Sequence, residues 1–236
     1  MLAITGSGLI PADQVEEQLS FELPDGSPPS AENNRLEKDD FLTPEKQENV
    51  IRSALPVAEY NAPQMDDGSR SVDESLQMLA ALAAQGVTDV AATPHFYASE
   101  NSPERFLARR RHAWQRLAPH LTASLPAVHL GAEVLFFEGI AGYDKLTQLC
   151  LTGTDTLLLE MPFQQWTDAE LDVVTRLCIT LGYQVILAHL ERFLPLQKNR
   201  DILERILMLP VLVQLNAECL LPLFKRKPYL ELLRRG

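Results

Sequence analysis

Short apolar runs alternate along this chain with segments of helical periodicity, and this alternation constrains the fold more than any other feature. Runs of four to eight apolar residues between turn signals are typical of buried strands. Strands are expected at about residues 87–93, 127–134, 156–161, 184–188 and 211–215. Alternating strands and helices favour a mostly parallel sheet. The sequence therefore predicts one α/β domain whose sheet curves into a barrel, and 236 residues fit the roughly 200 to 250 that such barrels use.

Helix start and stop signals lie between the apolar runs. Ser71–Glu74 and Thr167–Glu170 are capping-box patterns, and Gly86 and Gly182 close the apolar stripes that follow them. Ser102-Pro103 opens another helix, because proline suits a first turn. We expect helices at about 72–85, from 103, from 168 and at 200–208. The core stripe expected for the third of them is Leu171, Val174, Cys178 and Leu181.

The charge and the cysteine content limit the classes of protein to which this chain can belong. Eleven acidic and three basic residues in 1–50 supply −8 of the net charge of −11. We expect residues 1–55 to be an acidic, disordered or non-native extension, and residues 56–236 to be the barrel domain. An acidic chain repels phosphate backbones, so no nucleic-acid partner is expected. No apolar run approaches the roughly 18 residues of a membrane span, and three cysteines without a Cys-x-x-Cys pair favour reduced thiols in the cytoplasm.

Imidazole and carboxylate side chains stand at the far ends of successive apolar runs. They are His95, Glu133, Glu160 and His189. The ends of parallel strands meet at one rim, and imidazole nitrogen with carboxylate oxygen suits Mn, Zn or Fe. Such an ion lowers the pKa of bound water, so the pattern indicates a metallohydrolase. Taken singly, each residue could instead be a hydrogen-bonded polar side chain or part of a buried ion pair, with no metal bound.

Two sets of basic residues leave alternatives open. Arg192 follows His189 by three residues and could bind a phosphate at the same rim, or it could pair with Glu191. The run Arg109–His112 is expected to be a solvated helix face, because consecutive helical residues point in different directions. His112, His120 and His129 are not expected as metal ligands.

Five segments in order resemble the PHP-type protein-tyrosine phosphatases of bacterial capsule and exopolysaccharide loci. The resemblance covers about residues 63–220 and rests on 66–69 (Asp-Asp-Gly-Ser), 92–95 (Ala-Thr-Pro-His), 131–133 (Gly-Ala-Glu), 159–163 (Leu-Glu-Met-Pro-Phe) and 188–192 (Ala-His-Leu-Glu-Arg). It implies a distorted β/α barrel with up to three metal ions, usually Mn²⁺, that hydrolyses phosphotyrosine on a capsule-regulating tyrosine kinase. By position, the resemblance makes metal ligands of Asp67, His95, Glu133, Glu160 and His189, and makes Arg192 a phosphate-binding residue.

The chain departs from that family's pattern in two places. Pro56, Ala58 and Tyr60 stand where the family has Asp-x-His-x-His, and no Asp-x-His follows Leu220. We therefore expect an incomplete, C-terminally truncated barrel that lacks at least one metal site, as a truncated or wrongly joined product or as a degenerate relative. Two alternative functions stay open: a non-catalytic remnant that binds phosphopeptides, and another PHP-type phosphoesterase such as a histidinol phosphatase. The oligomeric state is left open.

Overall fold

The computed structural model describes residues 2–5, 58–59, 69, 71–221 and 227–235, which belong to one compact unit. Most of the extension expected at 1–55 lies outside the described residues, although Leu2–Thr5 forms a strand, β1. Asp67, a predicted metal ligand, also lies outside them. No helix among the described residues is long and apolar enough to cross a membrane.

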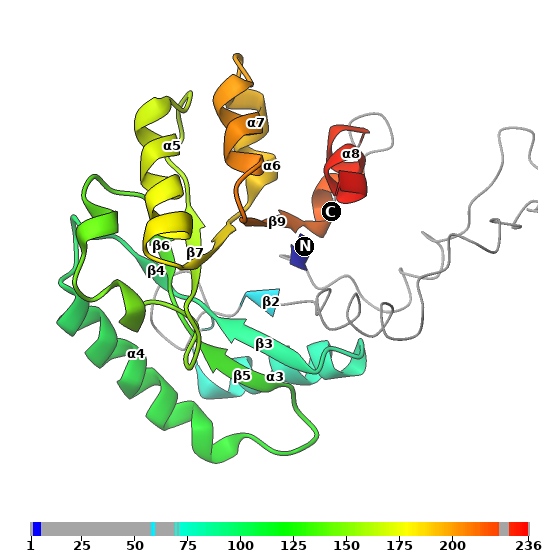
Figure 1. Cartoon of the computed structure of the whole chain (residues 1–236). Helices are drawn as coiled ribbons and strands as arrows, with labels where there is room; N and C mark the ends of the chain where they lie inside the picture. Colours follow the sequence, from blue (N-terminus) through cyan, green and yellow to red (C-terminus); the bar gives the residue numbers. More distant parts are fainter. Residues whose placement is uncertain (1, 6–57, 60–68, 70, 222–226, 236) are drawn as a thin grey trace, which may run out of the picture. The chain divides into compact units, whose positions relative to one another are not determined.

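Parallel strands form two sheets (Figure 1). The six-stranded sheet has the order β1-β9-β8-β7-β6-β4, and the three-stranded sheet has the order β2-β3-β5. Every recorded strand pairing is parallel, which confirms the predicted α/β class. The bounds are Ala58–Glu59 for β2, Asp89–Ala92 for β3, His95–Phe96 for β4, Ala127–Leu130 for β5, Glu133–Leu135 for β6, Thr156–Glu160 for β7, Gln184–Leu187 for β8 and Leu212–Asn216 for β9.

One expected strand is divided between the sheets, and a second is followed at once by a short strand of the other sheet. The strand predicted at 127–134 is β5 in the small sheet and β6 in the large one, so the prediction of one continuous strand was wrong. The strand expected at 87–93 is β3 in the small sheet, and β4 follows it in the large sheet. Gly131 lies at the first break, where a Cβ atom would stand 2.7 Å from Leu151 Cδ2. A larger residue here would require the Leu151 side chain to move, so glycine suits the point where the backbone passes from one sheet to the other.

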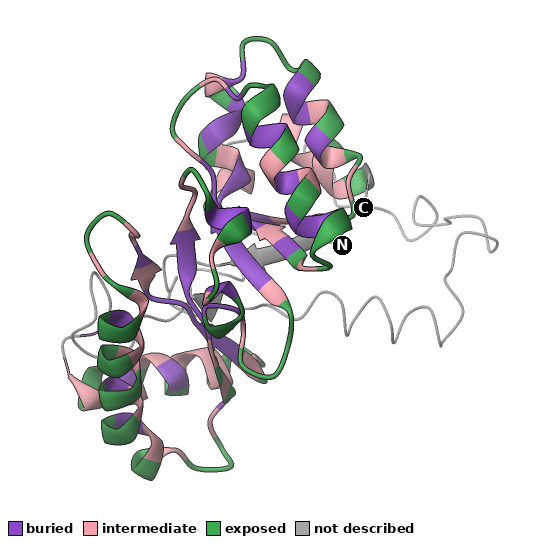
Figure 2. Cartoon of the chain, turned by 60° about the vertical axis from the view of Figure 1, so that its left-hand side comes forward, coloured by how far each residue is buried: buried purple, intermediate pink, exposed green. Residues whose placement is uncertain are grey.

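Two hydrophobic clusters fill the unit. In the smaller cluster, α3 (Val72–Ala84) and α4 (Pro103–Leu117) pack on β3 and β5 through Leu79, Leu117 and Val90. In the larger cluster, α5 (Asp168–Thr175) and α7 (Asp201–Leu207) cover the six-stranded sheet. Figure 2 shows buried strands against helices whose outer faces are exposed. The site described below therefore stands on a close-packed support.

The helix signals are largely confirmed. Ser71 accepts a hydrogen bond from the backbone N–H of Glu74, and the capping box of Thr167 and Glu170 is complete. Leu181 is 42% exposed, so it does not extend the core stripe of α5. The reason is a π-helical turn at Arg176–Thr180, which changes the direction in which the following residues point.

Short helical segments make up the remaining elements. They are η2 (Ala118–His120), η3 (Ile140–Gly142), η4 (Leu146–Gln148), α6 (Leu190–Phe193), η6 (Leu194–Leu196), η7 (Ala217–Leu220) and α8 (Lys227–Arg235). The most relevant of these is α6, because it begins directly after His189.

Candidate metal centre

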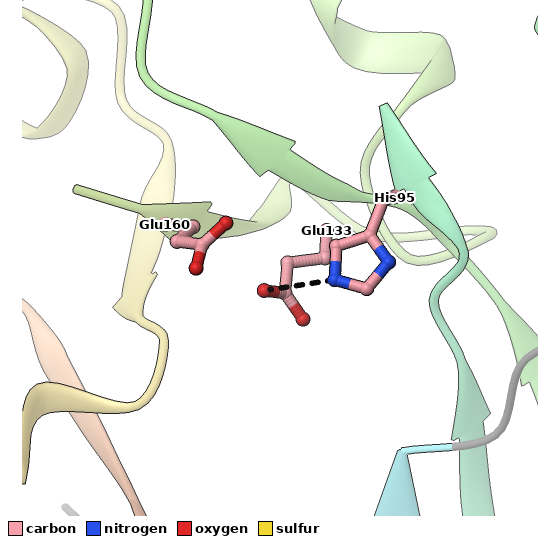
Figure 3. Close-up of side chains that lie close together, drawn as sticks. All are labelled: His95, Glu133 and Glu160. Carbon is pink, nitrogen blue, oxygen red and sulfur yellow. Dashed lines mark ion pairs between the residues drawn. The ribbon is translucent and has the colours of Figure 1, made fainter. Parts of the chain in front are cut away.

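Successive strands of the large sheet bring three predicted ligands together (Figure 3). His95 and Glu133 are register partners on β4 and β6, and Glu160 ends the neighbouring strand β7. One ligand atom from each of the three lies within 4.8 Å of the other two. Convergence of imidazole and carboxylate donors at adjacent strand ends is the arrangement that a divalent cation needs.

Glu133 stands between two imidazoles. Its Oε1 atom lies 3.7 Å from Nε2 of His95, and its Oε2 atom lies 3.4 Å from Nε2 of His189. The structure therefore brings four of the five predicted ligands into one cluster. The fifth, Asp67, is outside the described residues.

Burial makes the charged forms of the cluster's carboxylates unfavourable. The side chains of Glu133 and His189 are 2% and 4% exposed, whereas that of His95 is 22% exposed and gives the cluster a solvent-facing side. Burial, and next the charge of Glu133, raise the pKa of Glu160, while His95, His189 and Arg192 oppose that rise. Two buried carboxylates side by side are costly unless a cation compensates them.

The donors present fit a metal ion. Glu133 Oε1 is buried and has no hydrogen-bond partner among the described residues, and a buried carboxylate oxygen is normally bonded. A divalent cation would satisfy this oxygen, and imidazole with carboxylate suits Mn, Fe or Zn alike. Residues His95, Glu133, Glu160 and His189 are therefore the candidate ligands.

His189 adopts a backbone conformation that is unusual for its residue type. Its φ of 47° is the only positive φ of a non-glycine residue in the described part of the chain. Its N–H donates to Oε1 of Gln214, at 3.2 Å, and its carbonyl accepts from the N–H of Arg192, at 2.9 Å. Strained backbone of this kind persists where its surroundings hold it, and buried Gln214 on β9 supplies that hold. Gln214 was missed, although a polar residue inside a predicted buried strand was a usable signal.

Glu191 has a structural partner on β9. The backbone N–H and the side-chain amide of Asn216 donate to its carboxylate at 3.3 and 2.8 Å. No ion pair between Arg192 and Glu191 occurs within the described residues, so the alternative considered for Arg192 is not seen. Arg192 is exposed, on α6. Glu191 thus fastens the segment after His189 to the end of β9.

Arg110 behaves differently from the rest of its run. Arg109, Arg111 and His112 are exposed, as predicted, but Arg110 is half-buried. Its Nη1 donates to the carbonyl of Gly131 at 2.6 Å, and its Nη2 donates to that of Gln148 at 3.0 Å. Burial lowers the pKa of its guanidinium. The prediction of a solvated face was therefore wrong for this residue, which holds the turn two residues before Glu133.

The other histidines lie apart from the cluster. His112 and His120 are exposed on α4 and η2, and His129 on β5 forms a 2.8 Å contact with Asp89 across the small sheet. Among the described residues, the group able to hold a metal through three donors contains only His95 of the five histidines. His189 joins that group through its contact with Glu133.

Fold and site together define an α/β protein with a candidate metal centre at the ends of its parallel strands. The model of the capsular polysaccharide synthesis CpsB/CapC family matches residues 60–223. The chain belongs to this family, which confirms the resemblance identified in the sequence.

Relatives and a solved structure agree with this assignment. The tyrosine-protein phosphatases CpsB of Streptococcus agalactiae serotypes V and III are each 24% identical over 164 residues, covering 66% of this chain. The chain spans 65% of the length of these curated relatives. The fold matches, with a TM-score of 0.57 and 23% identity, a chain from the crystal structures of YwqE from Bacillus subtilis and CpsB from Streptococcus pneumoniae, described as unique metal-dependent tyrosine phosphatases. That match covers 73% of this chain and 70% of the other.

Proposed function

We propose that this protein is a metal-dependent phosphatase that hydrolyses phosphotyrosine on a protein of a capsule or exopolysaccharide system. The observation that carries the proposal is the cluster of His95, Glu133 and Glu160, in which Glu133 Oε1 is buried without a partner among the described residues. Membership of the CpsB/CapC family and the names of the relatives support the capsule context and the substrate.

The ligands divide between two kinds of surroundings. Glu133, Glu160 and His189 are buried, and partly exposed His95 lies on the side that faces solvent. When bound there, a divalent ion, which we propose to be Mn²⁺, lowers the pKa of water and so supplies a nucleophile at neutral pH. Asp67 is proposed as a further ligand. Glu133, with one oxygen toward each imidazole, would hold the ligands of both sides in place.

Arg192 is the proposed phosphate-binding residue. It lies on α6, three residues after His189, and its backbone N–H donates to the carbonyl of that candidate ligand. An exposed guanidinium can donate two parallel hydrogen bonds to phosphoryl oxygens. In this position it would orient the ester and neutralise charge that develops on the phosphoryl group.

The proposed partner is the phosphorylated tail of a bacterial tyrosine kinase, and the proposed location is the cytoplasm. The three free cysteines support a reducing compartment. A tail peptide is a suitable substrate form because its chain is accessible to a site at a protein rim.

Phosphate release from a phosphotyrosine peptide, measured with the full chain and Mn²⁺, tests the proposal. We expect turnover that a chelator abolishes, that Glu133→Gln removes and that Glu138→Gln retains, since Glu138 is exposed. Turnover that survives both chelation and Glu133→Gln would contradict the metal mechanism. Faster hydrolysis of histidinol phosphate than of the peptide would assign another substrate.

Non-catalytic phosphopeptide binding is the second candidate. It is favoured by Pro56, Ala58 and Tyr60, which stand where the resemblance places the Asp and the two His of Asp-x-His-x-His. In this case calorimetry would show peptide affinity that Arg192→Ala removes, together with no turnover at any Mn²⁺ concentration. Turnover by the wild-type chain would exclude this candidate.

A further inference from the structure

Aromatic side chains follow two of the metal-ligand positions at short distance along the chain. Tyr97 comes two residues after His95, and the two rings are stacked with centroids 5.7 Å apart and an interplanar angle of 9°. Phe163 comes three residues after Glu160 and is 59% exposed. Each aromatic residue is thus carried out of the buried cluster by the same strand exit that positions a ligand.

The position of Phe163 on the rim follows from its neighbours. Three residues of chain span at most about 10 Å, which limits how far Phe163 can lie from Glu160. The ring of Phe163 also packs at 4.7 Å, centroid to centroid, on Phe193, which directly follows Arg192. Phe163 is therefore close along the chain to the candidate ligand Glu160 and in contact with the segment that carries the proposed phosphate-binding arginine.

A hydrogen-bonded clamp holds Phe163 in this exposed place. Trp166 Nε1 donates to the carbonyl of Pro162 at 3.0 Å, and its backbone N–H donates to Oε1 of Gln197, also at 3.0 Å. Gln197 is 3% exposed, and its amide donates to the carbonyl of Gln164 at 2.9 Å. The loop is fixed on both sides of Phe163, so the exposed ring is preorganised.

We propose that Phe163 and Tyr97 form an aromatic rim that packs against the phenyl ring of the substrate and selects aryl over alkyl phosphate esters. This inference rests on the proposed phosphatase function and adds the residues that determine its specificity. Aromatic rings associate in offset or edge-to-face geometry at centroid distances of about 4.5 to 7 Å. A phosphoserine has no ring and would leave the exposed face of Phe163 in water.

Matched peptides that differ only in phosphotyrosine or phosphoserine test the rim. With the Mn²⁺-loaded full chain, Phe163→Ala is expected to lower kcat/KM for the phosphotyrosine peptide about 10-fold and to change that for the phosphoserine peptide less than about 2-fold. Tyr97→Leu should act in the same direction. Phe163→Trp should retain the preference. Ile179→Ala is the matched control, because Ile179 is an apolar side chain of similar exposure, 61%, that precedes β8 rather than following a ligand.

A binding measurement separates this inference from the proposed function. Calorimetry with a phosphonate analogue of the phosphotyrosine peptide is expected to show about 10-fold weaker binding to Phe163→Ala, with thermal unfolding confirming that the variant is folded. A wild-type chain that neither hydrolyses nor binds overturns the proposed function. A wild-type chain that does either, while Phe163→Ala is unchanged or loses both peptides equally, overturns the rim alone.

Discussion

At the scale of single residues, Glu133 is the side chain on which the centre depends most. It is buried, it faces an imidazole with each oxygen, and one of those oxygens has no hydrogen-bond partner within the described part. The same carboxylate that is unfavourable in the metal-free chain is the most useful ligand when a cation is present. Stability and function therefore make opposite demands on this residue.

Glu133→Gln is expected to separate these two demands. Metal affinity should fall by more than about 100-fold, because loss of outer partners alone costs about 10- to 100-fold and here a ligand is lost. In chelator, the variant should melt at the same temperature as the wild type or higher, since a buried charge is gone. Metal content and thermal unfolding measure both effects, with Glu138→Gln as control. A variant that keeps its metal, or melts lower in chelator, would refute this account.

Gln214 is expected to act on the centre through His189. Gln214→Leu removes the acceptor of the His189 N–H and the support of its positive φ. We expect about 1 to 3 kcal/mol lower stability and about 10-fold weaker metal binding. Gln184→Leu is the control, because the exposed side chain of Gln184 donates to the carbonyl of Pro210 and not to a candidate ligand. Equal effects of the two variants on metal affinity would argue against a positioning role for Gln214.

At the scale of elements, the existence of strands and helices was predictable, and their assignment to sheets was not. Apolar periodicity indicates that a segment is buried, so the runs that became β7, β8 and β9 were found nearly to the residue. Periodicity says nothing about which neighbour a strand pairs with. At the crossing, Gly131 lies against Leu151 and Thr93, which are distant in sequence and close in space. Local pattern therefore described 127–134 as one strand where the fold has two.

Arg110 joins elements that local pattern left unrelated. It ties α4 to the turn before β6 and to η4 through two backbone carbonyls. Arg110→Met should lower the free energy of unfolding by about 2 kcal/mol, because charge-assisted bonds in a half-buried place are lost. Exposed Arg111→Met should change it by less than about 0.5 kcal/mol. Urea denaturation measures both, and comparable losses would show that Arg110 has no special role.

At the scale of the whole molecule, the candidate site was more predictable than its support. Parallel strands present their exits at one edge, so polar residues after separate apolar runs could be expected to meet, and four of them do. The residues that hold them, such as Gln214 and the pair of Glu191 with Asn216, act across strand pairings. Such contacts depend on register and chain crossing, which a sequence pattern does not contain.

The cysteines of the molecule bear on the mechanism of the proposed phosphatase. The three thiols are free, and burial raises the pKa of Cys150 and of Cys219 to about 11 and raises that of Cys178. A thiol acts as a nucleophile through its thiolate, so none of the three is poised for catalysis near neutral pH. This agrees with the proposal that the metal centre, and not a cysteine, carries the chemistry.

Iodoacetamide and a chelator should accordingly differ in their effect on the turnover of the native protein. At pH 8, alkylation is expected to be slow and to leave phosphotyrosine turnover intact, while chelation removes it; in urea all three thiols should react. The raised pKa values of the thiols also determine how stability changes with pH. The folded state favours the neutral thiols, so their contribution to stability is complete below about pH 9 and is lost as the pH rises from there toward 11. Rapid inactivation by iodoacetamide at pH 8, with the metal content unchanged, would instead place a cysteine in the reaction.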